Sequence, residues 1–232
     1  MCRWGRASDL SLCGETLPAR RWLLRVSVAV RSALLIAAVV TCIVSSGATV
    51  RADGLSQAEN SRLLRGETVV RFQSLARGAQ RYVGGLAYAI VDAPIDDLAP
   101  LLDDVNAWKR ILPKTRSARR IGVVDGDPLV AMTHGTAFVE ASYTMRVHRE
   151  DYAVRFWMDR RRTHDIEDAW GFLRAEPMPD GRTLITYGVL IDMGPGLIRD
   201  LFEESVRRLA LSVPDRVRAF VLERKGLVHP PQ

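Results

Sequence analysis

Few side chains in this chain of 232 residues have the types and spacing that catalysis or metal binding requires. The densest group is His164-Asp165, followed by Glu167 and Asp168. It borders a predicted strand, where neighbouring side chains point to opposite faces, so at most alternate members converge. The other histidines are predicted beside a turn (His134), on the polar side of a strand (His148) and in the tail (His229). We therefore expect neither a metal ion nor a cofactor.

Known catalytic motifs are missing from the sequence. It has no His-Glu-x-x-His motif and no phosphate-binding glycine loop, and Ser142 and Ser205 lack the glycines of a nucleophile elbow. All three cysteines, Cys2, Cys13 and Cys42, precede residue 53, so the chain beyond it has no thiol chemistry. Catalysis would need an acid and a base that converge inside the fold. The candidates for such a pair are Glu140, Tyr143, His164 and Asp168.

Positive charge is concentrated at the N-terminus. The formal net charge is +6, and the isoelectric point is about 9.6. Seven of the 33 basic and two of the 27 acidic residues lie in 1–52, which leaves 26 basic and 25 acidic residues downstream. This near-neutral remainder disfavours a nucleic-acid partner, because nucleic-acid-binding domains carry a basic face.

Residues 1–52 have the pattern of an export signal or a membrane anchor. Residues 32–50 are uncharged and follow several arginines, and small residues such as Ser46 and Ala48 suit cleavage by signal peptidase. We expect an exported protein, periplasmic or extracellular after cleavage. The alternative is a chain anchored in the membrane through the uncharged stretch. Arg20-Arg21 also resembles a twin-arginine signal, so the export route stays open.

One basic cluster lies within the domain itself. Arg160, Arg161 and Arg162 follow a predicted strand and belong to a hairpin loop. Such a charge run is usually just solvated. The functional alternative is contact with anionic lipid headgroups at a membrane surface.

The remaining pattern predicts a linker over 53–65, a folded domain over 66–226 and a tail over 227–232. Strands are predicted at 67–72 and 81–91, and Gly84-Gly85 within the second predicts a bulge or a sharp bend. Two short helices follow near 95–102 and 105–112. Turn signals and period-two alternation then predict about six strands up to residue 192, the clearest of them over 137–148.

Residues 196–225 carry the strongest helical pattern, with an apolar face that includes Leu201, Phe202, Val206, Leu209 and Val213. Pro214 interrupts the pattern and predicts a kink or two abutting helices. Ser212 with Asp215 suggests a new N-terminal cap at that point. We expect the part before Pro214 to cover the sheet and the part after it to lie toward the surface.

Three passages carry a resemblance to a known family. They are Ala89-Ile90-Val91-Asp92-Ala93-Pro94, the segment 101–113 with Trp108 and Leu112-Pro113, and Ala169-Trp170-Gly171-Phe172 ahead of Asp180-Gly181. Through these passages, the segment 66–225 resembles members of the SRPBCC or START-like helix-grip superfamily, which has polyketide cyclase/dehydratase and coenzyme-Q-binding branches. Lys114 departs from the coenzyme-Q pattern and puts that branch's ligand in doubt.

The resemblance implies an α+β helix-grip fold, in which a curved antiparallel sheet wraps around a long C-terminal helix, with two short helices after the first main strand. It also implies a cavity that holds a hydrophobic small molecule, such as a lipid, a quinone or a polyketide-like compound. Candidates for the cavity lining are Trp108, Tyr143, Met145, Trp157, Trp170, Tyr187, Phe202 and Val206. For each one alone, ordinary core packing is the simpler interpretation.

We therefore expect an exported, non-enzymatic binding protein. One alternative is a cyclase/dehydratase-type enzyme that acts on a hydrophobic substrate in the same cavity. Another is a protein-interaction module.

Overall fold

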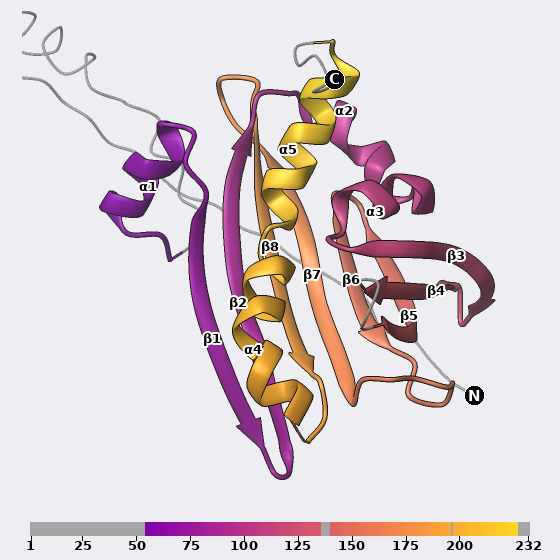
Figure 1. Ribbon diagram of the computed structural model, residues 1–232. Helices are drawn as coiled ribbons and strands as arrows, with labels where there is room; N and C mark the ends of the chain where they lie inside the picture. The colour runs from indigo at the N-terminus through magenta and orange to yellow at the C-terminus, as the bar shows by residue number, and fades with distance from the viewer. Residues whose placement is uncertain (1–53, 136–139, 196, 227–232) are drawn as a thin grey trace, which may run out of the picture. The chain divides into compact units, whose positions relative to one another are not determined.

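A single antiparallel sheet organises the part of the chain that the computed structural model describes, which is residues 54–135, 140–195 and 197–226, without the side chains of 197–202. Its eight strands run in the order β1-β2-β8-β7-β6-β5-β4-β3 (Figure 1). The strands are β1 (Val69–Arg77), β2 (Gln80–Val91), β3 (Thr115–Val124), β4 (Asp127–Gly135), β5 (Glu140–Glu150), β6 (Ala153–Met158), β7 (Asp168–Pro177) and β8 (Thr183–Asp192).

The helices are α1 (Gln57–Leu64), α2 (Ile95–Leu98), the 3-10 helix η2 (Ala99–Leu102), α3 (Val105–Ile111), α4 (Leu197–Ala210) and α5 (Val213–Arg224). Strand, short helices, six strands and C-terminal helices follow one another as predicted, which confirms the α+β fold class. Residues 136–139, included in one predicted strand, lie outside the described residues. None of the helices in the described segments combines the length and hydropathy needed to span a membrane.

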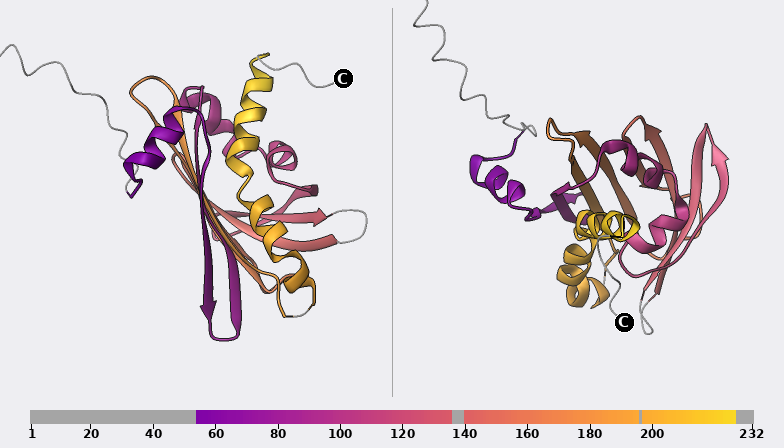
Figure 2. Two further views of the ribbon diagram at one scale, coloured as in Figure 1. Left: turned by 60° about the vertical axis from the view of Figure 1, so that its left-hand side comes forward. Right: turned by 90° about the horizontal axis from the view of Figure 1, so that it is seen from above.

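The sheet curves toward one side, and α3, α4 and α5 lie on that concave side (Figure 2). The main core forms there because β2, β8 and α3 all contact α5. Val213, Val217, Phe220 and Val221 of α5 are buried in one cluster with inward residues of the strands. Each fully buried side chain of this size stabilises the fold by about 1.5–3 kcal/mol.

The long C-terminal helix is broken into α4 and α5, as Pro214 predicts. Pro214 lies in the first turn of α5, where its missing N–H costs nothing. The predicted new cap is wrong, however: the Ser212 hydroxyl makes no cap hydrogen bond and donates to the carbonyl oxygen of Leu209 at 2.7 Å. The Asp215 carboxylate accepts from the Thr68 hydroxyl instead.

The two halves also divide their roles differently from the prediction. α5 does not lie toward the surface, because Val217 and Phe220 are part of the core. In α4, by contrast, Val206 and Leu209 are only partly buried. Among the described side chains, those after Pro214 are therefore the more completely buried, and α4 contacts β2.

The predicted linker over 53–65 is wrong, because it contains α1. Ser56 and Glu59 form a capping box at its start. Leu63 is buried on the convex side of the sheet with Val69, Tyr88, Ile90, Met178 and Leu184. A polar helix of two turns that buries one leucine leaves too weak a pattern to be detected in the sequence.

Gly84 and Gly85 allow the backbones of three strands to approach closely. The pairing of β2 with β1 and with β8 runs through both glycines without a shift, so the predicted bulge is wrong. Their φ angles are +156° and +145°. A Cβ on Gly84 would lie 1.9 Å from the carbonyl oxygen of Val189, and one on Gly85 would lie 2.0 Å from that of Arg71.

We predict that Gly84→Ala or Gly85→Ala lowers the free energy of unfolding by at least about 2 kcal/mol, since strained backbone of this kind costs about 1–3 kcal/mol before any clash. Urea unfolding followed by circular dichroism measures this change. Gly122→Ala is the matched control, because no heavy atom lies within 4 Å of its Cβ position. Equal stability of all three variants would contradict the assigned backbone approach.

Candidate functional site

Small side chains occupy several inward positions of the concave face. On β2 and β7 these positions include Ala87, Ala169, Gly171 and Ala175, all buried. Larger inward side chains come from β5, from β6 and from β8, which lies between β2 and β7. The small residues leave room beside these larger ones.

Two pairs of aromatic rings lie on this face. The ring of His134 on β4 is parallel to that of Tyr143 on β5, with 5.4 Å between centroids and 7° between planes. Phe156 on β6 and Tyr187 on β8 form the second pair, with centroids 6.2 Å apart. Gly171 on the intervening β7 makes this pair possible, because a Cβ there would lie 2.7 Å from the Phe156 ring.

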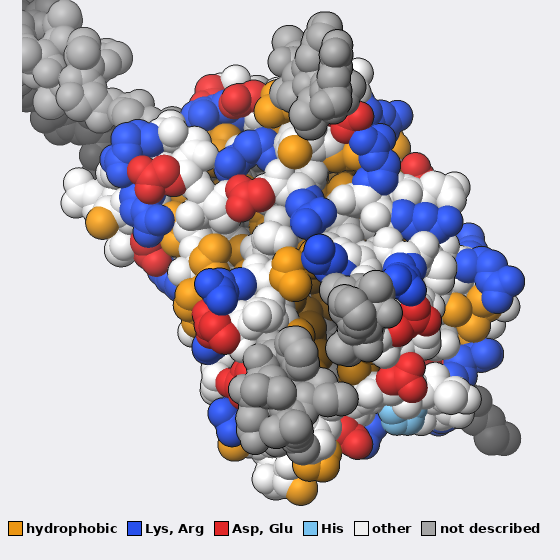
Figure 3. Space-filling view, in the orientation of Figure 1, with side chains coloured by type: hydrophobic (Ala, Val, Ile, Leu, Met, Phe, Trp, Pro, Cys, Tyr) orange, Lys and Arg blue, Asp and Glu red, His pale blue; other side chains and the backbone are white. Residues whose placement is uncertain are grey.

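The space between sheet and helices is not completely filled. Several apolar side chains that pack against the main core remain partly exposed: Val105, Trp108, Leu112, Tyr143, Phe156, Ile166 and Ile191. Hydrophobic side chains are visible in a recess in the middle of the face on which α4 and α5 lie (Figure 3). A recessed apolar surface of this kind is typical of a small-molecule site.

His134 is the polar residue of this face with the most defined surroundings. Its Nδ1 lies 3.2 Å from the carbonyl oxygen of Pro113 and 3.1 Å from the Thr115 hydroxyl. Its Nε2 is buried and has no hydrogen-bond partner among the described residues. Burial lowers the pKa of the imidazole, although the Pro113 carbonyl opposes this. The ring is therefore neutral near pH 7.

The phenols of Tyr143 and Tyr187 are also neutral. Burial raises the pKa of Tyr143, and burial followed by repulsion from Tyr143 raises the pKa of Tyr187. A neutral phenol both donates and accepts a hydrogen bond. The concave face therefore combines apolar surface with a few uncharged polar groups and can orient an apolar molecule.

Four of the predicted lining residues lie on or beside this face. Tyr143, Met145 and Tyr187 point inward from their strands, and Val206 lies partly buried on α4. Trp108 packs against the same core from α3, where its indole N–H donates to the carbonyl oxygen of Leu101 at 3.1 Å. The side chain of Phe202 lies outside the described residues.

Trp157 and Trp170 do not line the concave face. They lie opposite each other on β6 and β7 and point outward from the convex side, 37% and 41% exposed. Arg146 covers one face of the Trp157 ring, and the edge of Tyr82 meets Trp170. Their prediction as lining residues is wrong because size was weighed above strand parity.

The arginine cluster lies in the loop between β6 and β7. Arg160, Arg161 and Arg162 are all exposed. Arg162 pairs with Asp159 at 3.4 Å. Neither Arg160 nor Arg161 takes part in an ion pair with any residue that the structure describes.

The acid and base candidates suggested by sequence do not converge. Glu140 pairs with Arg116 at an exposed site, and Asp168 accepts a hydrogen bond from the Tyr82 hydroxyl on the convex side. His164 lies in the loop between β6 and β7. Tyr143 alone of the four faces inward, and no three metal-ligating side chains converge within the described segments.

His148 lies on the convex side, where its side chain is 45% exposed and also hydrogen-bonded. Its Nδ1 lies 2.7 Å from an oxygen of the buried Asp127 carboxylate, which Arg146 also contacts. The His148 hydrogen bond, followed by that of Arg146, lowers the pKa of Asp127. This network holds the turn between β3 and β4.

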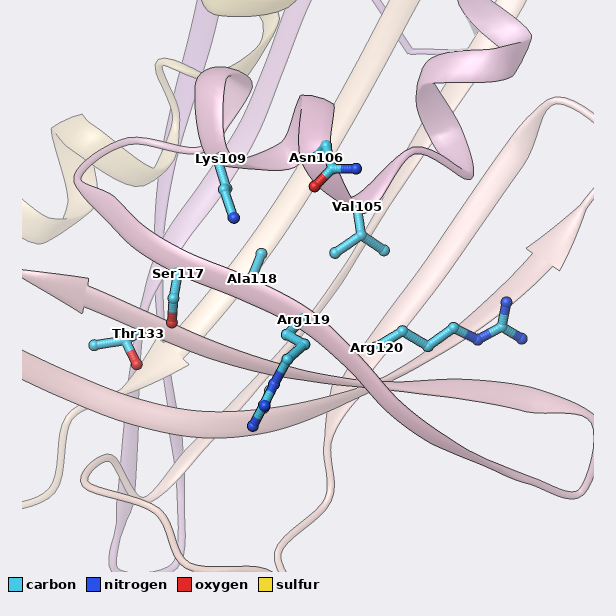
Figure 4. Close-up of a pocket in the computed structure, with 9 residues that line it drawn as sticks. Val105, Asn106, Lys109, Ser117, Ala118, Arg119, Arg120 and Thr133 are labelled. Atoms are coloured by element: carbon cyan, nitrogen blue, oxygen red, sulfur yellow. The ribbon is translucent and has the colours of Figure 1, made fainter.

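A separate groove of 590 Å³ lies at the β3 edge of the sheet (Figure 4). α3 contributes Asn106 and Lys109, and β3 contributes residues that include Ser117 and Arg119. Lys109 and Asn106 lie on one side of β3, while Arg119 lies on the other. The groove is open and cationic, so it does not resemble the predicted apolar cavity.

Sequence reasoning missed His134 and Phe156. His134 continues the inward alternation of Val130 and Met132, whereas the sequence pattern placed it beside a turn. Phe156 shares the inward parity of Val154 and Met158. Extending the period-two pattern to His134 would have placed the histidine on the apolar side.

Neither a protein-family model nor a curated protein matches the sequence. Solved structures are similar in fold. The Zhui aromatase/cyclase from Streptomyces sp. R1128 superposes with a TM-score of 0.53 at 16% identity, covering 67% of this chain and 96% of the enzyme.

A STAR-related lipid transfer protein fragment from Xanthomonas axonopodis gives a TM-score of 0.52 at 15% identity, over 66% of this chain and 93% of that one. The protein TTHA0849 from Thermus thermophilus superposes with a TM-score of 0.51 at 14% identity, covering 60% of this chain and 97% of that protein. At these identities the likeness concerns the fold, and it confirms the fold that the sequence predicts.

Proposed function

Because the chain has the START-like helix-grip fold, we propose that it binds a hydrophobic small molecule between the concave face of its sheet and α4. The observation that carries this proposal is the recessed inner surface, where small residues lie beside partly exposed rings such as Tyr143 and Phe156. Burial of a ligand there gains about 25 cal/mol per Å² of apolar surface.

Two of the similar structures support an apolar ligand in general terms. One is titled a lipid transfer protein and the other an aromatase/cyclase. We place this chain among the non-enzymatic binders, because the carboxylates Glu140 and Asp168 lie away from the concave face.

The second candidate is an enzyme of the cyclase/dehydratase type. The neutral imidazole of His134, stacked on Tyr143, is the observation that favours it, because such a pair offers a base beside a neutral phenol. Chromatography with mass spectrometry of the bound compound distinguishes the two: a binder returns it unchanged, whereas an enzyme returns an isomer of changed retention time after cyclisation or a product lighter by one water after dehydration.

We predict that protein purified without denaturants carries co-extracted apolar compounds, detectable by native mass spectrometry, and takes up fluorescent lipid or quinone probes. Val206→Trp should weaken probe binding roughly tenfold, about 1.4 kcal/mol, by occupying the space beneath α4. Arg208→Trp, at an exposed position of the same helix, should bind like the wild type. Repeatedly empty preparations that take up no probe would overturn the proposed function.

We further propose that the protein is exported, or anchored through residues 32–50, and that the loop between β6 and β7 contacts a membrane surface. Arg160 and Arg161 are exposed there, and Trp157 and Trp170 are exposed on the adjacent ends of the two strands. Tryptophan favours the membrane–water interface, and arginine is attracted by anionic headgroups.

A double variant Arg160→Gln/Arg161→Gln should bind phosphatidylglycerol-containing vesicles roughly 30-fold more weakly, because each basic residue contributes about 1 kcal/mol near such a surface. Co-sedimentation with vesicles of phosphatidylcholine, with and without phosphatidylglycerol, measures this. The control Arg119→Gln/Arg120→Gln removes two exposed arginines from β3. A larger loss in the control than in the loop variant would contradict the assignment.

A further inference from the structure

Three uncharged polar groups lie within the apolar concave face. The first is Nε2 of His134, a buried atom that has no hydrogen-bond partner among the described residues. The other two are the phenol hydroxyls of Tyr143 and Tyr187, whose side chains point inward from β5 and β8. A polar atom that is buried without a partner, as His134 Nε2 is, destabilises the fold. Such an atom calls for an explanation, and a ligand is one.

The surroundings of His134 fix which of its ring nitrogens carries the proton. The carbonyl oxygen of Pro113 can only accept, so Nδ1 must be the N–H that donates to it. The Thr115 hydroxyl donates to the carbonyl oxygen of Leu112 at 3.0 Å, which leaves its oxygen free to accept from the same Nδ1–H. In the neutral ring, Nε2 then carries a lone pair and no hydrogen.

The backbone next to His134 supports this orientation. Lys114 adopts a φ of +56°, which is uncommon for a residue with a side chain. Its carbonyl oxygen accepts a hydrogen bond from the N–H of Gly135, so the turn that presents the Pro113 carbonyl is tied directly to the strand of His134. The imidazole is therefore held on its Nδ1 side, and its Nε2 side is left for another group.

The other two groups supply the complementary half of a hydrogen-bonding site. The Tyr143 ring is parallel to the imidazole, and Tyr143 lies close enough to Tyr187 for its charge to raise the pKa of Tyr187. Both phenols have a hydrogen to donate, whereas Nε2 can only accept. A group that satisfies all three kinds of atom must both donate and accept, as a hydroxyl does.

We propose that His134 Nε2 accepts a hydrogen bond from a hydroxyl group of the bound molecule, which makes the preferred ligands apolar alcohols and phenols. This inference rests on the proposed function, since it names the class of molecule held in the same space. A ketone, an ether or a hydrocarbon of equal size leaves Nε2 unpaired. Sites built to bond a hydroxyl discriminate strongly against analogues that lack one.

The test compares 4-octylphenol with its methyl ether, 4-octylanisole, in which a methyl group replaces the hydrogen of the O–H donor. Displacement of a fluorescent apolar probe gives the affinity of each. The wild type should bind the phenol at least roughly tenfold more tightly than the ether. Equal affinities for the two compounds would overturn the inference and leave the proposed function standing, whereas binding of neither would overturn both.

Two variants distinguish the roles of the two imidazole nitrogens, Nδ1 and Nε2. The amide of His134→Asn reaches the position of Nδ1 and can still donate to Pro113, but it leaves no acceptor at the position of Nε2. The amide oxygen of His134→Gln can reach that position. We expect His134→Asn to lose the preference for the phenol while keeping the affinity for the ether, and His134→Gln to retain part of the preference. An undiminished preference in folded His134→Asn would overturn the role of Nε2.

A measurement on the wild type covers the case in which the variants fail to fold. The ¹⁵N resonances of the histidine rings report which nitrogen carries hydrogen. Free protein should show one imidazole with hydrogen on Nδ1 only. Its Nε2 resonance should shift when 4-octylphenol is added and stay in place with 4-octylanisole. A hydrogen on Nε2 in the free protein would overturn the inference.

Discussion

The burial of one face of α5 against the concave side of the sheet is the interaction on which the rest of the structure depends. Val213, Val217 and Val221 are at most 4% exposed, and they join residues from β2, β8 and α3 in one core. This contact holds α5 against the sheet, so the attachment of α5 does not depend on the packing of α4. The break before Pro214 separates α5 from α4, whose described residues Val206 and Leu209 are only partly buried. A binding space beneath α4 is thus compatible with a stable fold.

The two faces of the sheet have different chemistry. The convex face carries ion pairs, the network of Asp127, Arg146 and His148, and the exposed pair of tryptophans. The concave face carries small residues, rings and uncharged polar groups. The concave face therefore suits an apolar molecule that is oriented by hydrogen bonds. The convex face and its loops carry charged groups that suit contact with a charged surface.

Much of the fold could be predicted from the sequence, because strands and helices give hydrophobic patterns with different periods. The alternation over 137–148 predicted an antiparallel strand, and the helical pattern interrupted by Pro214 predicted a divided C-terminal helix. The family resemblance implied the curved sheet. The site follows less well, because parity, and not residue size, decides which face a side chain occupies. Trp157 was assigned to the cavity for its size, yet the neighbouring Phe156 is the inward ring.

Other features depend on contacts that are distant in sequence. The role of His134 rests on a carbonyl 21 residues away, presented by a turn in which Lys114 has positive φ. Residue pattern alone carries no signal for such a geometry. The same holds for α1, whose single buried leucine becomes meaningful only against the convex face of strands that follow it.

The central claim is that α4 covers a ligand space while α5 belongs to the core. Hydrogen exchange followed by mass spectrometry tests it most directly, because amide exchange reports the opening of each helix separately. In ligand-free protein the amides of α4 should exchange faster than those of α5. Addition of 4-octylphenol should slow exchange in α4 and leave α5 unchanged. If the two helices open as one unit and the compound alters neither, the account is contradicted.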